Sequence, residues 1–99
     1  MANSIPKLFT AQEANGNSSS LKWEGGVGYL VGGGTFTAAT IEVQYSPDGG
    51  TTWLATSETL NAIGMNRFDL PPGHIRVNQS STAGDSIDAW VGKVHPVMV

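Results

Sequence analysis

The chain has 99 residues and a formal net charge of −3, and only 13% of its residues are charged, against roughly 25% in an average soluble domain. Glycine (13 residues) and proline (5) are frequent, while cysteine is absent, which excludes a disulfide framework, a thiolate nucleophile and a cysteine-based zinc site. This size and composition favour one small, turn-rich β domain and exclude a coiled coil, a helical bundle and a multidomain enzyme.

The N-terminal residues 1–20 are predicted to form an irregular arm, followed by one β-sandwich domain over residues 21–99. Residues 14–20 are small and polar and show no periodicity. Three apolar side chains lie upstream of them, namely Ile5, Leu8 and Phe9. Two interpretations stay open: these side chains close one end of the domain's own core, or the arm docks on a neighbouring subunit.

Strand patterns recur along the rest of the chain, with turn sequences between them. The clearest strand spans residues 35–45, where apolar and polar residues alternate from Ile41 to Tyr45. Further strands are predicted at residues 27–31, 53–56, 67–70, 74–78 and 86–94. The pattern predicts an all-β fold, an antiparallel β-sandwich or jelly roll of about seven or eight short strands.

One local motif stands out at residues 46–53, which read Ser-Pro-Asp-Gly-Gly-Thr-Thr-Trp. It resembles the Asp box of sialidase-type propellers and of other β folds through Ser46, Asp48, Gly50, Thr52 and Trp53. A sialidase needs several such boxes and a cluster of arginines, whereas this chain has one box and two arginines. We therefore interpret the motif as a structural hairpin turn.

No catalytic, cofactor-binding or metal site is predicted, and the protein is expected not to be an enzyme. The glycines of residues 25–34 do not form a nucleotide-binding loop. His74 and His95 have no nucleophile elbow to accompany them. The spacing of Asp85 and Asp88 matches no EF-hand loop, and turn capping is the commoner use of such residues.

Trp23, Trp53 and Trp90 are three large aromatic residues in a small chain. Trp90 alternates with Ile87 and Val91, so it is expected to point to the opposite side of its strand. Three interpretations stay open for Trp90: a subunit interface, the core of another layer, or a platform for a ligand.

Four segments taken together, residues 41–45, 48–53, 70–73 and 75–77, resemble small β proteins of tailed-bacteriophage virions. The resemblance covers roughly residues 36–94. It implies a virion structural protein, a capsid decoration or cement protein of the jelly-roll type. Such a protein binds the major capsid protein on the outer capsid surface as a homotrimer. On this interpretation Ile5, Leu8, Phe9 and Trp90 are the candidate interface residues.

Charge and hydropathy indicate which partners and which location to expect for the protein. The five basic residues are scattered, which argues against binding to a nucleic-acid backbone. The start of the chain lacks a signal-peptide core, and the longest apolar run is far too short to span a membrane. The protein is expected to be made in the host cytoplasm and to need no cofactor.

The alternative function is a carbohydrate- or receptor-binding β-sandwich module of a tail or adhesin. The three tryptophans keep this alternative open.

Overall fold

The computed structural model describes residues 5–93, and this part of the chain contains nine β-strands and no helix. The strands are β1 (Lys7–Gln12), β2 (Gly16–Asn17), β3 (Leu21–Trp23), β4 (Gly26–Thr35), β5 (Thr40–Ser46), β6 (Leu54–Leu60), β7 (Gly64–Leu70), β8 (Gly73–Ser80) and β9 (Ser86–Lys93). The predicted all-β antiparallel sandwich is confirmed. Seven of these strands begin at or after Leu21, and the N-terminal residues add β1 and β2.

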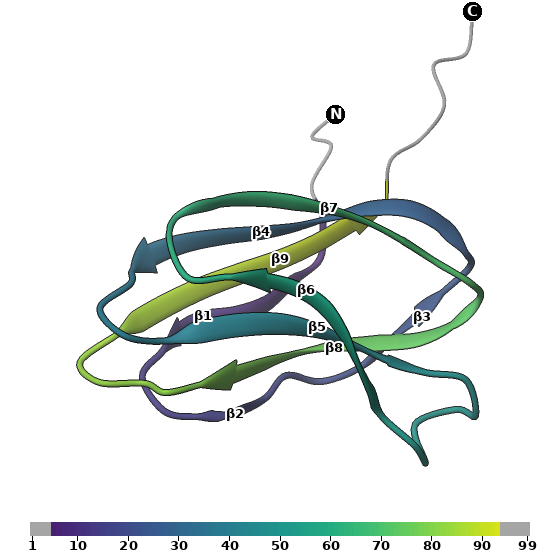
Figure 1. Ribbon diagram of the computed structural model, residues 1–99, viewed down its shortest axis with the longest axis horizontal. Helices are drawn as coiled ribbons and strands as arrows, with labels where there is room; N and C mark the ends of the chain where they lie inside the picture. Colours follow the sequence, from purple (N-terminus) through teal and green to yellow (C-terminus); the bar gives the residue numbers. More distant parts are fainter. Residues whose placement is uncertain (1–4, 94–99) are drawn as a thin grey trace, which may run out of the picture.

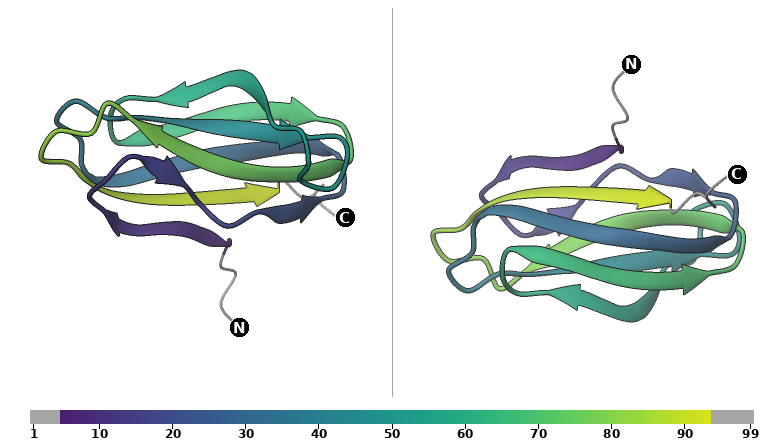
Figure 2. Two further views of the ribbon diagram at one scale, coloured as in Figure 1. Left: turned by 90° about the horizontal axis from the view of Figure 1, so that it is seen from below. Right: turned by 90° about the horizontal axis from the view of Figure 1, so that it is seen from above.

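The strands form two antiparallel sheets that pack face to face (Figures 1 and 2). One sheet has the order β1-β9-β4-β7, and the other has the order β2-β8-β5-β6, with β3 also paired to β8. The pairing is nested along the chain, because β1 pairs with β9, β2 and β3 with β8, β4 with β7, and β5 with β6. This is the strand order of a jelly roll, with β2 and β3 as two pieces of one strand.

The core lies between the two sheets and is built from the inward-facing residues of both. Its buried apolar members are Phe9, Trp23, Leu30, Ala39, Ile41, Val43, Phe68, Ile75, Val77, Ile87, Ala89 and Val91. On β4 the inward positions alternate between glycine and leucine, and Gly28 leaves room for the rings of Trp23 and Phe68. These rings pack with their centroids 5.2 Å apart at a tilt of 49°, which is a favourable aromatic geometry.

The N-terminal residues differ from the irregular arm expected over residues 1–20. Residues 7–12 form the edge strand β1, and Pro6 O accepts a hydrogen bond from Val91 N at 3.1 Å. Phe9 is only 4% exposed and belongs to the core, and Leu8 packs partly against it. The apolar side chain of Phe9 therefore closes the core of its own domain, because burial of its ring outweighs the entropy of ordering the segment.

A buried carboxylate joins two loops at one end of the sandwich. Asp85, between β8 and β9, accepts hydrogen bonds from the backbone amides of Thr37, Ala38, Ala39 and Ala83. Burial acts to raise the pKa of Asp85, but these four hydrogen bonds outweigh it and lower the pKa to about 2. The ionised side chain thus fixes the β4–β5 loop to the β8–β9 loop.

Candidate interaction surface

The solvent side of the β1-β9-β4-β7 sheet carries several outward-facing apolar residues. We call it the four-stranded face and define it by Ile5, Lys7, Val27, Tyr29, Val31, Met65, Arg67, Asp69, Asp88 and Trp90. The inward residues of β4 and β9 are buried and their outward residues are half-buried, so each strand presents one side to water.

Strand pairing brings the residues of this face together in rows across the sheet. Trp90 pairs with Val31, and Val31 pairs with Met65, which gives an apolar row over three strands. In the next row Gly92 pairs with Tyr29, and Tyr29 pairs with Arg67. Residues that are far apart in the sequence thus form one continuous surface.

Large side chains cover two glycines of the face. A Cβ atom placed on Gly33 would lie 3.3 Å from Cζ3 of Trp90, so the indole ring lies over this glycine. A Cβ atom on Gly92 would overlap the side chain of Ile5, which covers that glycine in the same way. Apolar and aromatic side chains therefore cover the backbone of the face at both glycines.

The apolar surface continues toward the outer edge of β7. Met65 is 67% exposed, and Ile63 in the preceding loop is 69% exposed. Ile5, which covers Gly92, is 37% exposed. Side chains of this size are costly to keep in water, and a contiguous exposed group of them is typical of an interaction surface.

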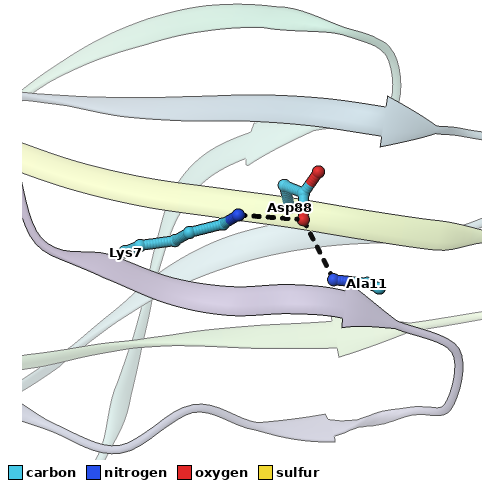
Figure 3. A network of polar contacts seen from close by, with 3 residues as sticks. All are labelled: Lys7, Ala11 and Asp88. Atoms are coloured by element: carbon cyan, nitrogen blue, oxygen red, sulfur yellow. Dashed lines mark hydrogen bonds and ion pairs between the residues drawn. The ribbon is translucent and has the colours of Figure 1, made fainter.

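An ionic contact holds β1 at the margin of the face (Figure 3). The Asp88 carboxylate accepts a hydrogen bond from Ala11 N at 2.9 Å and pairs with Lys7 Nζ at 3.3 Å. The hydrogen bond from Ala11, aided by Lys7, lowers the pKa of Asp88 below its usual range. Lys7 Nζ also lies 5.0 Å from the centre of the Trp90 ring, so three side chains share this contact.

The opposite sheet presents a polar surface. On its outer side Arg76 Nε donates a hydrogen bond to Gln44 Oε1 at 2.8 Å, and Asn78 Nδ2 donates one to Asn17 Oδ1 at 2.7 Å. The Arg76 guanidinium also stacks on the Trp53 ring at 4.2 Å. The two faces of the sandwich therefore differ in chemistry, since one is largely apolar and the other is internally hydrogen-bonded.

The turn at residues 46–53 is tied together by its own side chains. Ser46 Oγ accepts a hydrogen bond from Gly50 N at 2.8 Å, and Asp48 Oδ1 accepts one from Thr52 N at 2.8 Å. Hydrogen bonds from the Thr52 backbone and hydroxyl, followed by one from Ser46, lower the pKa of Asp48 to about 2. Gly50 has a φ of 102°, which favours glycine. Trp53 follows the turn as the partner of Arg76.

The remaining candidate residues lie apart from one another. His74 is on β8, where it pairs with Lys22 and Ser46, and His95 is outside the described residues. Asp85 joins two loops, whereas Asp88 lies on the four-stranded face. Within residues 5–93, no group of three or more histidine, aspartate or glutamate side chains could hold a metal ion. The same part of the chain has no helix long and apolar enough to cross a membrane.

Trp90 lies on the four-stranded face, on the side of β9 away from Ile87 and Val91, and Ile5 lies beside it. Phe9 faces inward instead, and sequence reasoning did not pick out Tyr29, Met65 or Arg67. The alternation of Val27, Tyr29 and Val31 with Gly28 and Leu30 is the signal that could have identified Tyr29.

No known protein family, characterised protein or solved structure shows a significant match to this chain. The jelly roll alone does not determine a function, because viral capsid proteins, lectins and cupins all use it. The surface is therefore the best guide to what the protein does.

Proposed function

We propose that the protein is a structural protein of a bacteriophage virion, a capsid decoration or cement protein that binds the major capsid protein through the four-stranded face. The observation that carries this proposal is the apolar row of Trp90, Val31 and Met65 on one side of the sandwich. The resemblance of residues 36–94 to small virion proteins supplies the partner. Neither a catalytic residue nor a cofactor is needed for such a function.

The size of the face suits binding to a repeating surface. Four strands spaced ~4.8 Å apart, each about seven residues long at ~3.3 Å per residue, cover roughly 450 Å². A stable interface covers about 800 Å² on each partner, so one such contact is weak. On a capsid lattice many equal contacts act together, and a homotrimer that presents three faces gains further from this effect.

At two sheet edges, those of β1 and β6, the strands favour association through a face over association through strand pairing, whereas the edge strand β7 pairs with β4 in an unbroken register. The pairing of β1 with β9 is broken by two register shifts, and Ala11 in β1 has a φ of 47°. The pairing of β5 with β6 is also shifted once, and Ser57 in β6 has a φ of 67°. Such irregular strands are poor templates for adding a further strand.

Low charge supports the same proposal. The ionic groups at the margin of the face are Lys7, Arg67, Asp69 and Asp88, and the first of them is already paired with the last. Removing charges from water costs more than the new contacts return unless each charge is paired. The Lys7–Asp88 pair can therefore be covered at a lower cost than two unpaired charges, whereas Arg67 and Asp69 would need partners of opposite charge on the capsid.

Replacing Met65 by glutamate is expected to weaken binding to capsids at least about tenfold, or ~1.4 kcal/mol. The substitution places a charge in the proposed contact, beside Val31, where it loses its water. Leu54, which is 48% exposed on β6 of the other sheet, provides the matched control Leu54→Glu. Co-sedimentation of each variant with purified phage capsids that lack this protein measures the effect.

Both residues are exposed, so the thermal midpoints of the two variants should stay close to that of the wild type. Binding that is equal for wild type and Met65→Glu, or a loss only in Leu54→Glu, would contradict the docking face. Detection of the chain in purified virions by mass spectrometry is the independent test of its location.

The position of Trp90 favours carbohydrate binding as the second candidate function. Trp90 lies over Gly33 and is half-buried, and Tyr29 lies in the neighbouring row, so two aromatic side chains that could contact a sugar lie close together. A glycan array probed with the wild type and with Trp90→Ala separates the two functions. Binding to one class of glycan that Trp90→Ala abolishes favours the carbohydrate module.

A further inference from the structure

We infer that Asn15 is a site of spontaneous chemical modification, at which the backbone nitrogen of Gly16 displaces the side-chain amide and leaves aspartate or isoaspartate. This inference does not depend on the proposed function. It rests on the sequence Asn15-Gly16 and on the exposure of Asn15 in the bend between β1 and β2. It also rests on the hydrogen bond that the Asn15 side chain accepts from Thr82 N.

The reaction needs water and no other reagent. A bond forms between Gly16 N and Asn15 Cγ, and the bond from Cγ to the side-chain nitrogen breaks. The proton of the Gly16 amide moves to this nitrogen, which already carries two hydrogens, so that ammonia leaves and a five-membered succinimide remains. Water then opens the ring at one of its two carbonyl carbons, which gives aspartate or isoaspartate.

The surroundings of Asn15 favour this attack. Thr82 N donates a hydrogen bond to Asn15 Oδ1 at 2.9 Å, which draws electrons from Cγ and makes it a better electrophile. Gly16 has no Cβ to crowd the ring closure. Its strand β2 is only two residues long and lies at the edge of the sheet, so local opening releases the Gly16 nitrogen at little cost.

The sequence Asp48-Gly49 could form the same kind of ring, but its hydrogen bonds protect it from this reaction. Asp48 also precedes a glycine, but its Oδ1 atom accepts hydrogen bonds from the backbone amides of Thr51 and Thr52. These contacts keep the carboxylate ionised, and an ionised carboxylate is a poor electrophile. The two sites therefore differ in reactivity although their following residue is the same.

The product changes how the N-terminal segment is attached. An isoaspartate at position 15 adds one carbon atom to the backbone between β1 and β2, and either product places a negative charge next to Thr82 N. Strand β2 pairs with β8 through Gly16 and Asn17 alone. A change of one backbone atom is therefore enough to disturb this pairing.

The test is to hold the purified full-length chain in mildly alkaline buffer and to follow the peptide that contains Asn15 by mass spectrometry, with isoaspartate detected by enzymatic methylation. The matched control is Gly16→Ala. A Cβ at Gly16 would lie 3.7 Å from Gln12 Nε2, an ordinary contact, so this variant keeps the fold. We expect modification at Asn15 in the wild type and a rate on the order of tenfold lower in Gly16→Ala, because the new Cβ crowds the ring closure.

Two results would overturn the inference. One is an equal rate in the wild type and in Gly16→Ala. The other is a folded wild type that stays unmodified while the same chain in urea is converted. Asn15→Gln provides a second variant that should abolish the signal, since ring closure from a longer side chain is slow. Asn17, which accepts a hydrogen bond from Asn78 and precedes a serine, should change more slowly in the same samples.

Discussion

Replacing Asp85 by asparagine is expected to lower the thermal midpoint on the order of 10 °C. The buried carboxylate accepts hydrogen bonds from the amides of Thr37, Ala38, Ala39 and Ala83. Asparagine has no charge, and its side-chain NH₂ group would face amide donors that then lack an acceptor. Circular dichroism during heating at neutral pH measures the change.

The pH dependence gives a second test of the same contact. The pKa of Asp85 is about 2 in the folded protein, below the ordinary value of 3.8. Its contribution to stability is therefore fully present above about pH 4 and is lost as the pH falls toward 2. The stability curves of the wild type and Asp85→Asn should converge on acidification. Asp69→Asn, on the exposed side of β7, is the matched control and should shift the midpoint little.

Replacing Phe9 by alanine is expected to cost about 3–5 kcal/mol of unfolding free energy, as is usual for a buried phenylalanine. Phe9 is 4% exposed and belongs to the core although it lies in the edge strand β1. Urea unfolding followed by tryptophan fluorescence measures the loss.

Thr10→Ala is the matched control, because Thr10 is the exposed neighbour on the same strand. It should change the free energy of unfolding by no more than about 0.5 kcal/mol. A Phe9→Ala variant as stable as the control would mean that the N-terminal segment is not part of the folded domain. A destabilised variant would also predict that removal of residues 1–20 impairs folding of the remaining chain.

The sequence predicted the central strands and their inward faces well. Strands were predicted over residues 41–45 and 74–78 from the side-chain period of two, and the apolar residues that alternate with polar ones there, Ile41, Val43, Ile75 and Val77, lie in the core. Strand β1 was missed for a physical reason. Its two register shifts and the positive φ of Ala11 break the alternation, so that Phe9 is its one buried residue.

The candidate surface was predicted only in part. The alternation of β9 placed Trp90 on the outer side, but nothing in the local sequence indicates that Val31 and Met65 lie beside it. Those neighbours come from strands that are distant in the chain, and their contact depends on the register of β4 with β7 and β9. The cover over Gly33 also depends on this register, because it brings Trp90 next to this glycine.

By itself, then, the sequence determined the properties that arise from neighbouring residues. These are the all-β class, the period of the strands, the turn at residues 46–53 and the low charge. Only the tertiary structure decided which strand pairs with which, that Phe9 belongs to the core, and that Asp85 binds amides of residues 37–39. The reason is that each of these contacts joins segments distant in the chain, and a local pattern carries no information about its distant partner.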